Sequence, residues 1–90
     1  MSKPTKTERV REIRDQIASL LRSKRNYEAT VRHLESALDG LDDNDPENGD
    51  AARVWMSQLC HADDMANRAE RHVMRLRNEL ADELSRKVAA

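Results

Sequence analysis

The sequence predicts an all-α fold, an antiparallel two-helix hairpin with coiled-coil-like packing. Two long stretches carry apolar residues at alternating three- and four-residue spacing, the pattern of helices that pack along a narrow stripe. Between them, residues 39–50 hold both glycines, one of the two prolines and six of the seventeen acidic residues, as expected of a polar turn. Charged residues make up 37%, and aromatics are one Trp and one Tyr, which is typical of surface-rich helices without a thick core.

The first helix is expected over about residues 6–39. Thr5 followed by Glu8 matches a capping box, so the helix should begin near residue 6. Gly40 is expected to end it in the left-handed conformation. We call the row of residues that faces the other helix the seam, and nine of its ten positions here are apolar or Tyr: Val10, Ile13, Ile17, Leu20, Lys24, Tyr27, Val31, Leu34, Leu38 and Leu41.

A turn over residues 40–45 leads to the second helix, expected over about residues 46–88. Asp45 is placed as its N-cap, Pro46 as its first helical residue and Glu47 as an acid in the first turn, with Asp50 as a rival N-cap. The apolar seam fails at Glu83. Before that point it reads Ala52, Trp55, Leu59, Ala62, Ala66, Ala69, Val73, Leu76 and Leu80.

The loop length sets an antiparallel register between the two seams. In this register Tyr27 faces Ala66 and Lys24 faces Ala69, so that large side chains meet small ones, as close packing requires. The ends of the seams then pair as Leu41 with Ala52 and Ile13 with Leu80.

The length and composition of the chain predict a single domain, residues 1–90, in a soluble cytoplasmic protein. One cysteine, Cys60, cannot form an internal disulfide, which fits a reducing compartment. The first ten residues lack the apolar core of a signal peptide, and no apolar run approaches the ~18 residues of a membrane span. Net charge is −1 but unevenly spread: residues 38–64 hold eight acids against one base, a net −7, and the remainder is +6.

A second, weaker apolar stripe follows the second helix, and we call it the methionine face. It consists of Met56, Cys60, Met74, Ala81, Leu84 and Val88, with Ala18 and Leu21 added from the first helix, and it is diluted by Asp63, Asn67, Glu70 and Arg77. Because a two-helix unit hides only one seam, this stripe predicts a further contact. We expect a homodimer packed as a four-helix bundle, or a groove for a different protein partner at Met56, Cys60, Met74 and Leu84.

An arginine face is expected on the second helix, formed by Arg68, Arg71, Arg75 and Arg77 with His72. Acids nearby favour a solvated surface, with Asp64 paired to Arg68 and Glu79 to Arg75. Arginine outnumbers lysine twelve to four, which suits contacts to phosphate and leaves nucleic-acid binding as an alternative. In being a short helical hairpin that dimerises, the chain resembles Rop, the plasmid RNA-binding regulators, in architecture alone.

The acids of the turn offer another surface. Asp42, Asp43 and Asp45 are candidates for contact with a basic protein patch. A calcium loop is not expected, because the glycine of this stretch is Gly49 and does not occupy the sixth loop position. In addition, no glutamate stands at the last position of such a loop. Cys60, His61 and Asp64 lack a partner set for a metal ion, so we predict neither a metal nor another cofactor.

Lys24 is the one charged residue of the first seam. We expect a device that fixes the pairing, with its ammonium reaching Glu28 or Glu70. The stretch from Ile13 to Arg25 resembles the first helix of the small all-helical chorismate mutases, in which a leucine pair precedes a catalytic arginine by three positions. That resemblance places Lys24 at the catalytic position and implies an enzyme as a further alternative. The resemblance also implies a second basic residue later in the same helix, but the corresponding position here is Glu35.

These observations favour a non-enzymatic protein–protein interaction module. We expect a small helical-hairpin adaptor, inhibitor or regulatory subunit that acts through its surface. Short, charged hairpins of this kind are typical of regulators and inhibitors encoded by phages and other mobile elements. A nucleic-acid-binding regulator is the first alternative, and the small enzyme is the second.

Overall fold

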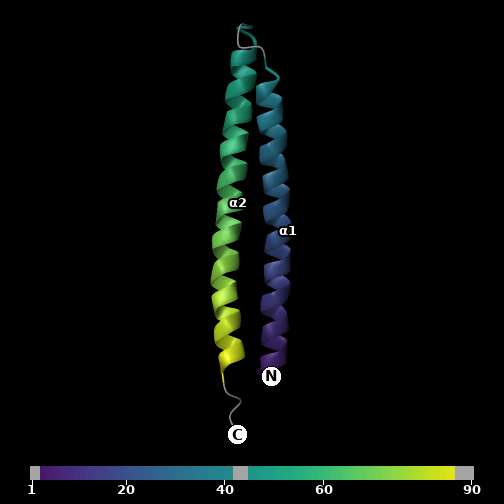
Figure 1. Ribbon diagram of the computed structural model, residues 1–90, viewed down its shortest axis with the longest axis vertical. Helices are drawn as coiled ribbons and strands as arrows, with labels where there is room; N and C mark the ends of the chain where they lie inside the picture. Colours follow the sequence, from purple (N-terminus) through teal and green to yellow (C-terminus); the bar gives the residue numbers. More distant parts are fainter. Residues whose placement is uncertain (1–2, 42–44, 87–90) are drawn as a thin grey trace.

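Two long helices lie side by side and antiparallel in the computed structural model, which describes residues 3–41 and 45–86 (Figure 1). Helix α1 spans Lys6–Asp39 and α2 spans Asn48–Ser85. The start of α1 and the end of α2 lie at one end of a rod that measures 73 × 24 × 14 Å, and the turn lies at the other. The predicted all-α hairpin is confirmed.

The start of α1 follows the predicted capping. Thr5 has an extended backbone, and its Oγ1 accepts a hydrogen bond from the Glu8 amide at 3.2 Å. The Thr5 carbonyl accepts from the Arg9 amide at 3.0 Å, which is the first bond of the helix. Thr5 therefore satisfies one of the amides that a helix start leaves without a partner.

The end of α1 differs from the prediction, because Gly40 is not left-handed. Its φ of −82° and ψ of −6° are right-handed values. The Gly40 amide donates to the Ser36 carbonyl at 3.2 Å, and the Leu41 amide donates to the Leu38 carbonyl at 3.1 Å. Backbone bonds that tighten the last turn satisfy the final carbonyls, so the chain leaves the helix without a positive φ.

Helix α2 begins two residues later than predicted. Pro46 and Glu47 form a turn, in which Asp45 Oδ1 accepts from the Glu47 amide at 3.0 Å and the Asp45 carbonyl accepts from the Asn48 amide at 3.1 Å. Asp45 thus caps a turn ahead of the helix, and Asp50 lies in the first helical turn. The predicted end at residue 88 falls outside the described residues. Within them, α2 ends at Ser85.

The buried residues follow the predicted seam. The apolar ones are Ile17, Leu34, Ala62, Ala66, Ala69, Val73 and Leu76, and Glu83 is buried as well. Ile17, Val73 and Leu76 form a buried apolar cluster, and partly buried neighbours pack around it: Ile13, Leu20, Leu21 and Leu80. No large side chain in the described part of the chain is fully enclosed, because each helix covers only one side of the other.

Two ion pairs between the helices agree with the predicted register. Lys24 Nζ lies 3.6 Å from Glu70 Oε1, and Arg9 Nε lies 2.6 Å from Glu83 Oε1. Each pair is within one residue of the pairing that the register implies. The two helices therefore hold one alignment from the Lys24–Glu70 pair to the Arg9–Glu83 pair.

Candidate interaction surfaces

The methionine face is exposed in the hairpin. Met56, Met74 and Leu84 expose 48%, 58% and 50% of their surfaces, and Cys60 and Ala81 are also exposed. Val88, the last predicted member, lies outside the described residues. Apolar side chains of this size are covered when a helix packs on both sides, so the exposed row marks a side of α2 that α1 does not reach.

Heptad geometry divides the methionine face into two rows on α2. Because residues seven apart lie on the same side of a coiled-coil helix, each row is read in steps of seven. The first row is Met56, Asp63, Glu70, Arg77 and Leu84, and the second is Cys60, Asn67, Met74 and Ala81. Every one of these nine residues is exposed.

The Lys24 contacts show which side of α1 adjoins these rows. Lys24 Nζ lies 4.0 Å from Glu28 Oε1 and 3.6 Å from Glu70 Oε1, so both predicted partners are confirmed. Glu28 is seven residues from Leu21, and Glu70 belongs to the first row. The Leu21 side of α1 and the methionine rows of α2 therefore form one continuous face, as the sequence predicts.

Lys24 itself is a half-buried cation with two carboxylate partners. Its side chain is 25% exposed, whereas those of Glu28 and Glu70 are 45% and 54% exposed. The stem thus lies in the seam while the ammonium reaches the edge of the methionine face. This geometry is that of a charged residue that fixes how the helices pair.

The arginine face is only partly assembled. Arg68, Arg71, His72 and Arg75 line one shallow hollow on the flank of α2 opposite the methionine face. Arg77 does not line it, because it belongs to the first methionine row. The hollow therefore gathers three of the four predicted arginines and not Arg77, since two residues further along a helix is about 200° around it.

One of the two ion pairs predicted for this face is present in the structure. Arg68 Nε lies 3.0 Å from Asp64 Oδ2, as expected. Arg75 Nη2 lies instead 3.2–3.3 Å from the two ring nitrogens of His72, and Arg75 forms no ion pair with Glu79. Within the described residues Arg71 forms no ion pair, so it is the guanidinium most open to a ligand.

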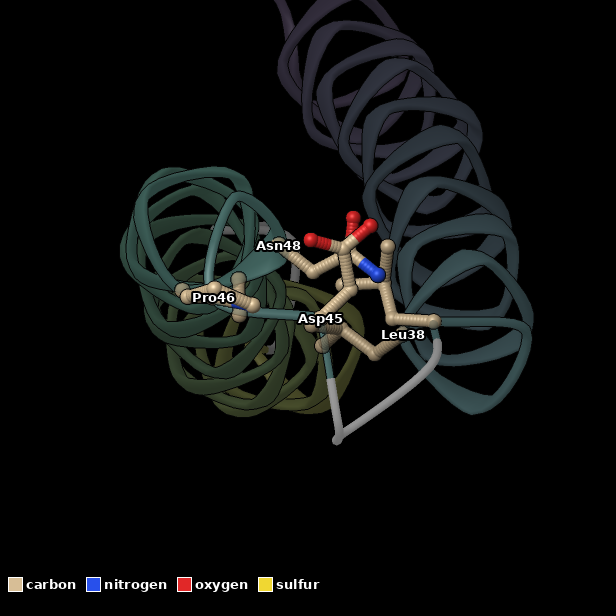
Figure 2. Close-up of a pocket in the computed structure, with 7 residues that line it drawn as sticks. Leu38, Asp45, Pro46 and Asn48 are labelled. Carbon is tan, nitrogen blue, oxygen red and sulfur yellow. The ribbon is translucent and has the colours of Figure 1, made fainter.

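The acidic turn is described at Asp45 but not at Asp42 and Asp43, which lie outside the described residues. The Asp45 carboxylate is exposed and already accepts the Glu47 amide, so part of its role is to hold the turn. A hollow between the end of α1 and the start of α2 adjoins it, and Figure 2 shows Leu38, Asp45, Pro46 and Asn48 around this hollow.

The open end of the rod holds a cluster that the sequence interpretation missed. Glu83, where the apolar seam fails, is buried with 8% of its side chain exposed, and it contacts Arg9 at 2.6 Å and Arg86 at 3.6 Å. Lys6 Nζ donates to the carbonyls of Leu84 and Arg86 at 3.3 and 2.8 Å. The signal was the position of Glu83 itself, since a charge in a seam position requires a partner.

Across the described residues, no helix is long and apolar enough to span a membrane, and no three His, Cys, Asp or Glu side chains gather into a set that could hold a metal ion. The chain matches no protein-family model, no curated protein and no solved structure.

Proposed function

We propose that the chain is a non-enzymatic protein–protein interaction module, a small helical-hairpin adaptor, inhibitor or regulatory subunit. The observation that carries this proposal is the methionine face. Met56, Met74 and Leu84 are all about half exposed on a rod whose helices bury only one seam. Adaptable methionine side chains in a continuous exposed row suit a surface that another protein covers.

The test places a photo-crosslinking amino acid at Met74 in the cells that naturally produce the chain. Val54 provides the matched control, because it is 53% exposed on α2 and lies in steps of seven from Arg68 and Arg75, on the opposite flank. We expect a discrete crosslinked protein from position 74 and none from position 54. Equal products from both positions, or none from position 74, would contradict the proposal.

A second candidate function is nucleic-acid binding through the arginine face. The observation that favours it is the hollow lined by Arg68, Arg71, His72 and Arg75, with Arg71 outside any ion pair of the described residues. Guanidinium groups gathered at one place bind phosphate well.

This candidate predicts that Arg71→Glu with Arg75→Glu abolishes binding to RNA or DNA in a gel-shift or fluorescence-anisotropy titration. Arg53→Glu, the same change at an exposed arginine on another part of α2, should have a much smaller effect. The affinity of the unaltered chain should also fall steeply as salt is added, because phosphate contacts release counterions. The absence of binding at low salt would remove this candidate.

A further inference from the structure

The order of residues along the methionine face reverses about a point near its middle. In the first row of α2, Glu70 is central. Seven residues to either side stand Asp63 and Arg77, which carry opposite charges. Fourteen residues to either side stand Met56 and Leu84, which are both apolar and exposed. A second copy of this row, turned end to end about Glu70, would meet every residue except Glu70 itself with a complementary one.

The second row has the same property about nearly the same point. Cys60 and Ala81 are equally far from residue 70.5, and so are Asn67 and Met74. Small and apolar side chains would therefore meet one another at the ends of the row, and an apolar side chain would meet an amide nearer the middle. No like charges would meet in this row.

Helix α1 repeats the pattern only at the outer positions of its rows, since nearer the centre Leu21 would meet Glu28 and Arg25 would meet its own copy. Arg14 and Glu35, which lie in the row of Leu21, are equally far from residue 24.5 and carry opposite charges. Arg11 and Asp39, in the next row, are equally far from residue 25. The Lys24–Glu70 ion pair of 3.6 Å places these centres at the same height as the centre on α2. One two-fold axis across the face can therefore relate both helices to their copies.

The charge distribution of the whole rod favours this orientation over the alternative. The turn end, residues 38–64, carries a net −7, and the remainder carries +6. An end-to-end reversed pair sets the acidic end of one copy beside the basic part of the other, whereas a pair with both turns at one end sets like charges together. The two helices lie in the 73 × 24 Å plane of the rod, which is wide enough for the ~800 Å² per partner of a stable interface.

The charges at the centre are also compatible with this pairing. The two copies of Glu70 would approach each other at the axis, but each already has Lys24 of its own chain beside it. Two lysines and two glutamates would then alternate around the axis. In addition, Asp63 and Arg77 form no ion pair within the described residues of a single chain, so both are available to a second copy.

We propose that the protein that covers the methionine face is a second copy of this chain, in an antiparallel four-helix bundle whose two-fold axis crosses the face at Glu70 and Lys24. Helix α2 then packs on α2 of the partner, with Asp63 beside the partner's Arg77. The inference rests on the proposed function, since it names the protein that occupies the face.

A charge exchange tests the pairing by sedimentation equilibrium. Asp63→Arg and Arg77→Asp alone each place like charges together twice per dimer, and we expect each to raise the dimer Kd at least tenfold. The double variant restores opposite charges and should return the Kd to within about threefold of the original. Arg75→Asp, in the row of Val54 on the opposite flank, is the matched control and should leave the Kd unchanged. All three substituted residues are exposed, and circular dichroism should confirm that helicity is retained.

Crosslinking tests the geometry independently. Cys60 is exposed and free, and its copy in the proposed dimer is about twenty residues away along the helix, roughly 30 Å. A short bismaleimide should therefore leave the unaltered chain unlinked. Ala81→Cys brings a second thiol opposite the partner's Cys60, and covalent dimers should form. Cys60 and residue 81 of one chain are also roughly 30 Å apart, so no link within one chain can imitate this result.

A monomer at concentrations up to about 100 μM, a double charge variant that is weaker than either single variant, or no covalent dimers from Ala81→Cys would overturn the inference. The proposed function would survive that outcome if the crosslinker at Met74 captures a different protein. If position 74 captures nothing, the proposed function fails as well.

Discussion

Glu83 shows how a single charged side chain ends an apolar seam without ending the helix. It is buried at a position where the periodicity requires contact with α1, and Arg9 of α1 supplies the counter-charge at 2.6 Å. Arg9 is 40% exposed and Arg86 is 69% exposed, so solvent reaches the cluster from outside. The pair is therefore intermediate between a surface ion pair and a fully buried one.

Arg9→Met should lower the free energy of unfolding by about 1–2 kcal/mol, because it leaves the largely buried Glu83 carboxylate with only the exposed Arg86 as a partner. Adding Glu83→Leu should recover most of the loss by extending the apolar seam. Urea unfolding at one fixed protein concentration measures both effects. The exposed pair Arg68–Asp64 is the control, and Arg68→Ala should cost less than about 0.5 kcal/mol. If the double variant is no more stable than Arg9→Met, Glu83 does not act as a seam residue.

Lys24 acts at the same scale through its two carboxylate neighbours. Lys24→Met should leave the hairpin helical, because methionine fits an apolar seam, but it removes the counter-charge of Glu70 at the proposed axis. We expect the dimer Kd to rise at least tenfold, and Glu70→Gln in the same chain to reverse that change. Sedimentation equilibrium with circular dichroism measures both. A Kd unaffected by Lys24→Met would show that Glu70 lies away from the contact between copies.

At the scale of the elements, the ends of the helices departed furthest from the sequence interpretation. Gly40 is right-handed, and α2 begins at Asn48 after a turn that Asp45 stabilises. In both places the chain has several local ways to satisfy backbone groups, and their free energies differ by little. The glycines are therefore not required by their backbone conformations.

Gly40→Ala should raise the free energy of unfolding by about 0.4–1 kcal/mol, because alanine restricts the unfolded chain and strains nothing in the folded one. A Cβ at this position would lie 3.6 Å from the Ala37 carbonyl oxygen, an ordinary contact. Gly49→Ala should have a similar effect, since a Cβ there meets nothing within 4 Å. Urea unfolding measures both variants. A loss of stability at Gly40 would indicate a left-handed residue, as the sequence alone suggested.

At the scale of the whole molecule, the main feature is that acidic and basic residues are separated along the rod. Residues 38–64 and the remainder differ in sign, although the chain is almost neutral in total. Such a distribution does not change how one hairpin folds, but it orients any two hairpins that meet along their length.

The proposed dimer should therefore weaken as salt is added. Raising ionic strength from about 0.05 to 0.5 M shortens the screening length from about 14 Å to about 4 Å, which removes most of the attraction between opposite ends. We expect the Kd to rise several-fold in sedimentation equilibrium. A Kd that falls with salt would indicate like charges in contact, and hence two hairpins with their turns together.

The sequence by itself determined the two helices, the seam between them, their register and the presence of a second apolar stripe. These features repeat over many turns, so that a periodic pattern such as Val73 with Leu76 and Leu80 outweighs any local exception. It also placed the Lys24 contacts, because seam geometry leaves a long side chain few carboxylates to reach.

Only the tertiary structure decided how the exceptions were resolved. It paired Glu83 with Arg9, turned Arg75 toward His72 and set Gly40 in the right-handed region. Each depends on small differences between alternative local contacts, which are settled by the three-dimensional position of neighbours on the other helix or on the adjacent turn. A repeating pattern along one chain specifies which face meets its partner, but not which of several nearby charges completes each contact.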